Sequence, residues 1–204
     1  MGRRVFLFFI FICLTFSVIS QDRTGRYEDN TSMDVLINDN NARSCYRAAG
    51  IAARIHYTSS LELEKCNVAL TRSALSPRDR AATLTNRGII HMALDHFDAA
   101  ISDFNGALEL KPEFGEIHVN IGNIYFINDD YSGAVEEYTA AIEKETTKAH
   151  VAHINRGMAY EKMGDLGNAE QDYRIALELL PGASLPRVRL EQLLRNTPDS
   201  TDNQ

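Results

Sequence analysis

The chain has 204 residues, which is enough for one domain with a core and leaves little room for a second, catalytic domain. It is acidic, with 28 acidic against 21 basic residues and a formal net charge of −7. Binding to phosphate backbones needs clustered Lys and Arg, and we read no basic stripe in this sequence. We therefore expect no nucleic-acid partner.

Residues 1–20 are typical of a signal peptide. Arg3 and Arg4 precede an apolar run over 5–16, and Val18-Ile19-Ser20 offers a cleavage site. The run is short for a membrane span, although an uncleaved N-terminal anchor is the alternative. Lipid attachment at Cys13 is disfavoured because the preceding residue is the bulky Ile12. We predict an exported protein, either periplasmic or secreted, with no other membrane contact.

Residues 21–38 are polar and lack periodicity, so we expect a flexible linker there. Residues 39–80 predict a degenerate helix pair that caps the N-terminal end. Its first helix is expected to end near Ala49, with Gly50 as the stop. Ser59 and Glu62 form a capping box that would open the second helix.

Two cysteines, Cys45 and Cys66, remain once the leader is removed. An even number of cysteines in an exported protein favours a disulfide, and two buried free thiols are the alternative. If both helices have the predicted ends and are antiparallel, the two cysteines lie at nearly matching depths. A first helix that continued to Tyr57 would strain the bridge.

The stretch 81–181 repeats itself at periods of 34 and then 35 residues. Self-similarity at this period is typical of a helical solenoid, in which each helix pair buries its apolar face against a neighbour. Small and aromatic residues fall in register in four columns: Gly88, Gly122 and Gly157; Ala100, Ala134 and Ala169; Phe104, Tyr138 and Tyr173; Ala107, Ala141 and Ala176.

These columns resemble the tetratricopeptide repeat, with units at 81–114, 115–149 and 150–183. Pro112 and Pro181 close the first and third units, whereas Thr146-Thr147 stand where the middle unit would have proline. The resemblance implies an all-α, right-handed superhelical solenoid of antiparallel helix pairs. From Cys45 to Pro181 the chain also resembles small exported bacterial proteins of this kind.

A last helix is predicted over 184–196, with Ser184 as its cap and Pro186 in its first turn. One side of this helix is apolar and the other is charged, as the end of a solenoid requires. We expect 197–204 to be a disordered tail.

No catalytic constellation is present in the sequence. It lacks a glycine-rich phosphate loop and a Gly-x-Ser-x-Gly elbow, so we predict no enzyme and no cofactor. His150 and His153 lie three residues apart on a predicted helix, and His118 is the equivalent of His153 in the preceding unit. Packing explains these histidines better than a metal site. A hydrolase with a site on the groove is the least favoured alternative.

Asparagine occupies the sixth place of every unit, at Asn86, Asn120 and Asn155. The resemblance implies that this helix of each pair lines a concave groove, where an amide can grip a peptide backbone. The alternative is that each asparagine bonds the backbone of the adjacent helix. The other groove places carried over are Thr85, Ile89, Met92, Glu116, Val119, Asn123, Phe126, Ile154, Met158, Glu161 and Lys162.

The family's two-carboxylate clamp needs Lys or Arg at the fifth and ninth places, and this sequence has neither there. The groove therefore suits an apolar extended segment or an amphipathic helix better than an acidic tail. We predict a non-catalytic module that binds a protein or peptide. Self-association through one end of the solenoid is the alternative.

Overall fold

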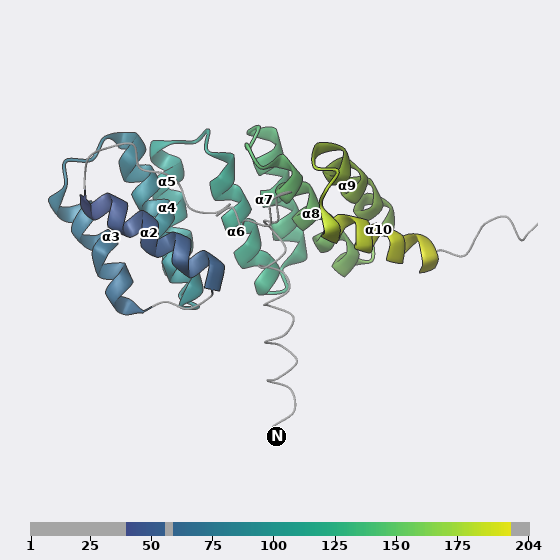
Figure 1. Cartoon of the computed structure of the whole chain (residues 1–204), viewed down its shortest axis with the longest axis horizontal. Coiled ribbons are helices and arrows are strands. Elements are labelled where there is room, and N and C mark those ends of the chain that lie inside the picture. The colour runs from purple at the N-terminus through teal and green to yellow at the C-terminus, as the bar shows by residue number, and fades with distance from the viewer. Residues whose placement is uncertain (1–39, 56–58, 197–204) are drawn as a thin grey trace, which may run out of the picture.

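Every regular element in the described part of the chain is an α-helix. The computed structural model describes residues 40–55 and 59–196, so the predicted leader, linker and C-terminal tail lie outside it. Figure 1 shows the helices as pairs stacked along one axis. In chain order they are α2 (Asn40–Ile55), α3 (Ser60–Arg72), α4 (Pro77–Ala93), α5 (Phe97–Leu110), α6 (Gly115–Ile127), α7 (Tyr131–Glu143), α8 (Ala149–Met163), α9 (Leu166–Leu179) and α10 (Ser184–Asn196).

Three antiparallel pairs, α4/α5, α6/α7 and α8/α9, form the repeats predicted from the sequence. The pair α2/α3 packs on α4 at one end, and α10 packs on α9 at the other. The all-α solenoid expected from the repeats is confirmed. None of the described helices combines the length and the hydropathy needed to cross a bilayer.

Within each pair the glycine column allows the two helices to approach closely. A Cβ atom added to Gly88 would lie 2.5 Å from Cε1 of Phe104. At Gly122 and Gly157 the added atom would lie 2.6 and 2.8 Å from the tyrosine ring of the same unit. These distances are too short for a carbon contact, so the aromatic column fixes glycine opposite it.

The first helix of each repeat ends in the same turn. Asp95, Asp129 and Gly164 adopt φ values of 59°, 62° and 81°. The next backbone N–H donates to the carbonyl five residues earlier in each case, for example from Asp130 to Tyr125 at 2.9 Å. This is the hydrogen bond of a Schellman motif, which favours glycine at the left-handed residue. Only the third repeat has glycine there.

The prediction for the first helix of the cap was wrong. α2 continues through Gly50 to Ile55, because an alanine-rich face packs on α3 and α4 and outweighs the weak helix propensity of one glycine. Cys45 and Cys66 nevertheless lie at disulfide-bonding distance in the structure, with their Cα atoms 4.7 Å apart. The two helices cross at the cysteines, so the distance from either helix end does not decide whether the bridge fits.

The connection between α7 and α8 replaces the expected proline with polar contacts. Both the backbone N–H and the hydroxyl of Thr147 donate to Oε1 of Glu116, at 3.2 and 2.7 Å. Burial alone would raise the pKa of Glu116, but these hydrogen bonds outweigh it and lower the pKa. Glu116, predicted as a groove residue, instead anchors this connection.

Candidate binding surface along the first helices

The asparagine column lies inside the protein. The relative exposure is 0 % for both Asn86 and Asn120, and 5 % for Asn155. A peptide lying on the surface of this structure could not reach the first two side chains. The groove places at Thr85, Ile89, Met92, Val119, Asn123, Ile154 and Met158 are buried as well.

Asn155 connects two neighbouring first helices. Its Nδ2 donates to Oδ1 of Asn123 on α6 at 2.9 Å, and the same oxygen accepts from the hydroxyl of Tyr138 at 2.8 Å. Burial raises the pKa of Tyr138, so the phenol stays protonated and keeps donating. Nδ2 of Asn123 is buried without a hydrogen-bond partner among the described residues. The contact of Asn155 resembles the alternative prediction, in which each asparagine bonds the backbone of the adjacent helix. Its partner here is a side chain and not backbone.

Helix α2 covers the first-helix face at the N-terminal end. Ile89 and Met92 belong to the same apolar cluster as Ala48, Ala49 and Ala52 of α2, which packs directly on α4. Small side chains on α2 let its backbone approach the longer side chains of α4. The first-unit part of the predicted groove is therefore occupied by the chain's own cap.

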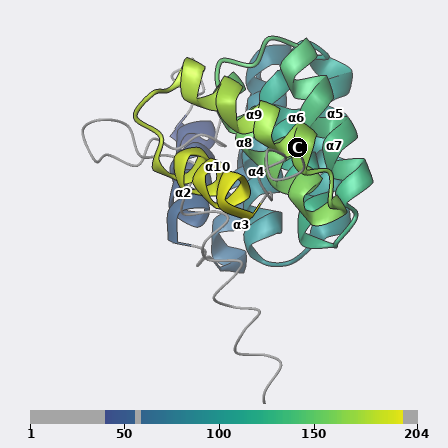
Figure 2. The ribbon, with the colours of Figure 1, turned by 90° about the vertical axis from the view of Figure 1, so that its right-hand side faces the viewer.

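Helix α10 covers the other end of the same face. Ile154 and Met158 share a cluster with Leu193 of α10. Glu161 accepts from the hydroxyl of Tyr173 and lies 3.9 Å from Nε of Arg189 on α10. Figure 2 views the array from the end that carries α9 and α10, and in both views α2 and α10 lie on the same side.

Four predicted groove residues keep accessible surface: Glu116, which anchors the α7–α8 connection, and three others. Phe126 and Glu161 are partly exposed, and Lys162 is exposed. Phe126 and Glu161 hold equivalent places in the last turns of α6 and α8, so they lie on neighbouring first helices. The ring of Phe126 meets that of Tyr131 edge-on, with centroids 5.4 Å apart. We call Phe126, Glu161 and Lys162 the open strip.

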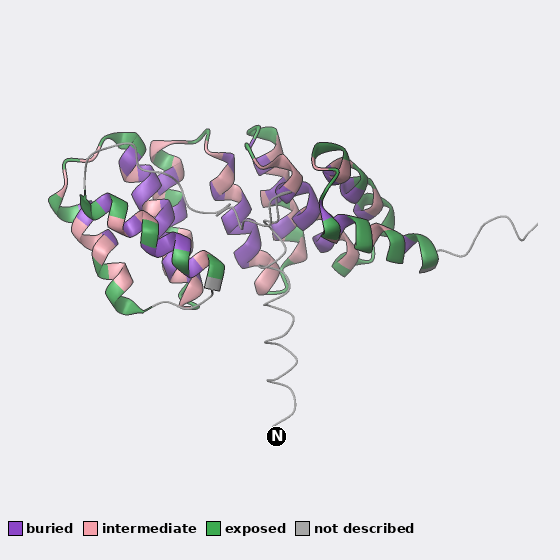
Figure 3. Cartoon of the chain, viewed as in Figure 1, coloured by how far each residue is buried: buried purple, intermediate pink, exposed green. Residues whose placement is uncertain are grey.

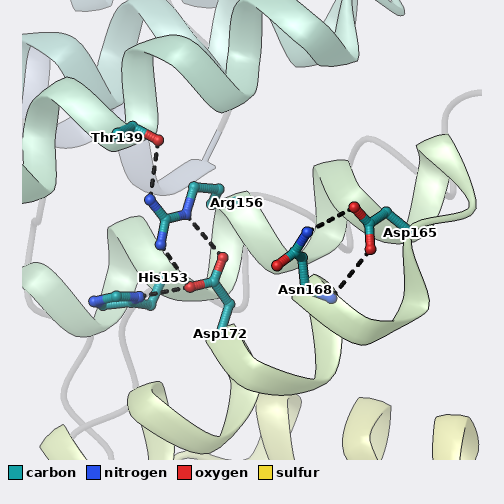
Figure 4. Close-up of polar contacts among 6 residues, drawn as sticks. All are labelled: Thr139, His153, Arg156, Asp165, Asn168 and Asp172. Carbon is teal, nitrogen blue, oxygen red and sulfur yellow. Dashed lines mark hydrogen bonds and ion pairs between the residues drawn. The ribbon is translucent and has the colours of Figure 1, made fainter.

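A buried ion-pair cluster holds the third repeat together (Figure 4). Nε and Nη2 of Arg156 each donate to a different oxygen of Asp172 at 2.9 Å, and Nη1 donates to Thr139 of the preceding repeat. Nδ1 of His153 lies 2.8 Å from Oδ1 of Asp172. Burial alone would raise the pKa of Asp172, but the hydrogen bonds from Arg156 and His153 outweigh it and hold the pKa below its usual value.

The first repeat has the same arrangement, which the sequence interpretation did not include. Arg87 donates to both oxygens of Asp103, at 2.8 and 2.6 Å, and to Asn67 of the cap at 2.8 Å. The spacing is a readable signal, because Arg87 and Arg156 hold one repeat position and Asp103 and Asp172 hold another. The middle repeat instead pairs His118 with Glu137 at 2.8 Å.

Two of the three histidines considered for a metal site, His118 and His153, thus pair with a carboxylate from the second helix of their own unit. Across 40–55 and 59–196, no group of three or more side chains is placed to hold a metal ion. The arrangement supports packing between helices.

Tetratricopeptide repeat families match residues 85–150 and 150–182 of this chain. Residues 85–182 of this chain are tetratricopeptide repeats. Such repeats generally serve as non-catalytic protein-interaction scaffolds.

Two curated relatives illustrate how far the similarity extends. The Lipoprotein NlpI homolog of Haemophilus influenzae is 24% identical over 118 residues, which cover 58% of this chain and 37% of that protein. Tetratricopeptide repeat protein 6 of Homo sapiens is 31% identical over 86 residues, covering 42% of this chain and 16% of that protein. The chain thus spans well under half of these relatives.

Solved structures agree on the fold. The tetratricopeptide repeat domain of Arabidopsis OM64 superposes with a TM-score of 0.55 at 19% identity, covering 59% of this chain and 98% of that domain. The N-terminal domain of stress-induced protein-1 from C. elegans gives 0.55 at 20% identity, with coverage of 59% and 99%.

Proposed function

We propose that this protein is a non-catalytic scaffold that acts outside the cytoplasm and holds a protein or peptide segment on the open strip. The observation that carries the proposal is that α2 and α10 close the two ends of the first-helix face, while Phe126, Glu161 and Lys162 keep accessible surface between them. The accessible part of the first-helix face is therefore short. It suits a ligand segment of a few residues better than a long extended tail.

The chemistry of the open strip defines the class of ligand. The edge of the Phe126 ring offers an apolar contact, while Glu161 and Lys162 place opposite charges one repeat further along. A segment with one apolar anchor and neighbouring polar residues, either extended or on one turn of an amphipathic helix, complements this pattern. The buried layer of Asn123, Asn155 and Tyr138 behind the strip sets the spacing of α6 and α8 and so keeps the strip in shape.

Three features support export. Residues 1–20 have the pattern of a signal peptide. Cys45 and Cys66 lie at bonding distance, and a disulfide persists in an oxidising compartment. One curated relative is named a lipoprotein. The proposed location is the periplasm or the medium, with an uncleaved N-terminal anchor as the alternative.

Site-specific photo-crosslinking in the native cell tests the binding surface. A photoreactive amino acid at Phe126 or Lys162 should give an adduct of one mass, because both positions border the same ligand. Matched positions on exposed parts of the second helices, Ser102 and Glu136, should not give it. Adducts of equal yield from all four positions, or from the second-helix positions alone, would move the binding surface elsewhere.

A second candidate function, self-association, is favoured by the apolar surface at the C-terminal end. Leu179, Val188 and Leu194 are 52 %, 48 % and 48 % exposed. If this end forms the contact, light scattering should give a concentration-dependent dimer, and Val188→Ser with Leu194→Ser should return a monomer. A wild-type protein that stays monomeric at all concentrations would exclude this function.

A further inference from the structure

The outward face of α2 carries a basic stripe. It consists of Arg43, Arg47, Ile51 and Arg54. At 100° per residue these four fall within an arc of about 80°, and they extend over about 16 Å of helix. All four are exposed, Ile51 at 48 %, and exposed bands follow α2 in Figure 3. The opposite side of α2 is buried through Cys45, Ala48, Ala49 and Ala52.

The sequence interpretation found no basic stripe, because the acidic total charge conceals an uneven distribution. Between residues 40 and 80 there are seven Lys and Arg against three Asp and Glu, a net charge of +4. Between residues 81 and 196 there are ten against eighteen, a net charge of −8. The molecule is therefore polarised along its axis, with the stripe on its positive end.

We propose that the basic stripe docks on the anionic lipid headgroups of a membrane surface. The guanidinium group matches phosphate in geometry and is weakly hydrated, so arginine is well suited to this contact. Arg54 already donates through Nε to the carbonyl of Gly50, so its two terminal nitrogens are the groups that would meet phosphate. Ile51, exposed among the arginines, can enter the boundary between headgroups and acyl chains.

The acidic repeats determine the orientation and the class of partner. An anionic bilayer attracts the cap and repels residues 81–196, so the array would project away from the surface and leave the open strip accessible. A nucleic acid that extended beyond the cap would be repelled by the acidic residues of the repeats. The apolar side chain of Ile51 would add little to its binding. The stripe therefore fits a flat lipid surface better than a polynucleotide.

Flotation of the full chain with lipid vesicles tests the proposal. The wild-type protein should bind vesicles of phosphatidylcholine with 30 mol% phosphatidylglycerol more strongly than vesicles of phosphatidylcholine alone. The variant R43Q/R47Q/R54Q should lose about tenfold or more of the binding to the anionic vesicles, since each basic residue near such a surface contributes to attraction. Raising the salt concentration from 50 to 500 mM should remove the wild-type preference.

The matched control R174Q/R187Q/R195Q removes the same charge from exposed positions on α9 and α10, and its binding should stay within about twofold of wild type. Ile51→Ser should weaken binding severalfold while keeping the salt dependence. Circular dichroism and the melting temperature should show that R43Q/R47Q/R54Q is folded.

Several outcomes would overturn the proposal. Equal losses in the two triple variants would mean that only net charge matters. Equal binding to the two kinds of vesicle, unchanged in R43Q/R47Q/R54Q, would assign membrane contact to the apolar N-terminal segment. If a DNA duplex binds and loses binding only in R43Q/R47Q/R54Q, while the vesicles do not bind, the stripe is a nucleic-acid surface.

Discussion

The outer repeats and the middle repeat are fastened to their neighbours in different ways. In the first and third repeats an arginine bridges a buried aspartate of its own unit and a polar side chain of the preceding second helix. In the middle repeat Ile121 holds the arginine position. Helix α6 packs on α5 through an apolar interface that is less extensive than the interface between α7 and α8. Identical packing columns can therefore conceal unequal junctions between repeats.

This difference matters for how the array opens. A solenoid is held by contacts between adjacent units, so its weakest junction is the place where local unfolding starts. We expect that junction at α5/α6, where no arginine ties the two units together. The open strip begins on α6, so opening there would change its shape before the outer repeats unfold.

The largest effect is expected from Asp172→Ala. Its side chain is 2 % exposed and receives Arg156 and His153, so its removal leaves buried donors without their acceptor. We expect a loss of about 3–5 kcal/mol in the free energy of unfolding, measured by urea denaturation of the full chain. The matched change Glu137→Ala in the middle repeat should cost about 1 kcal/mol or less, because that side chain is 25 % exposed. Equal costs would refute the difference between the repeats.

The dependence of stability on acidic pH should also test the ion-pair cluster around Asp172. The folded-state pKa of Asp172 is below its unfolded value of about 3.9. The stabilisation is therefore fully present above pH 4 and is lost as the pH falls through the folded-state pKa. The stability difference between wild type and Asp172→Asn should shrink as the pH falls below 4. A difference that grows on acidification would contradict this assignment.

The second largest effect concerns the cap. Replacing Cys45 and Cys66 together by alanine avoids an unpaired thiol and should lower the free energy of unfolding by about 3 kcal/mol, given the loop of about twenty residues that the bond closes. Peptide mapping after alkylation checks the premise, since neither cysteine should react before reduction. If both cysteines are labelled without reductant, α2 is held on the array by packing alone.

The sequence predicted the solenoid correctly because its main determinant is local and periodic. Each glycine meets an aromatic ring of its own repeat, and that requirement is visible at a fixed spacing. The ends of the helices in the cap were harder, because Gly50 stays helical only through burial against α3 and α4. Propensity alone indicates a stop at such a residue.

The binding surface was predicted only in outline. Repeat position identifies which helix faces inward, but it does not reveal that α2 and α10 return across the same face and bury Ile89 and Ile154. Those contacts involve α2 and α10, which lie outside the repeated units. A comparison of equivalent positions in the three repeats therefore cannot predict them. The basic stripe was not predicted from the sequence for a related reason. Its arginines are spaced for one face only along a helix that continues past Gly50.

The smallest expected effect concerns the turn that ends each first helix. Asp95 has φ of 59° with a side chain, where Gly164 has φ of 81° without one. Asp95→Gly should therefore raise the free energy of unfolding by about 0.5 kcal/mol, because the relief of left-handed strain exceeds the added flexibility of the unfolded chain.

Asp129→Gly should gain less than Asp95→Gly, since Asp129 also accepts a hydrogen bond from Tyr131 that the change removes. The reverse change, Gly164→Ala, should cost about 1 kcal/mol. Space does not limit an alanine there, because no atom lies within 4 Å of the added Cβ. Urea midpoints that decrease from Asp95→Gly through Asp129→Gly and wild type to Gly164→Ala would assign the differences to backbone conformation. An unchanged midpoint for Gly164→Ala would show that this turn relaxes without strain.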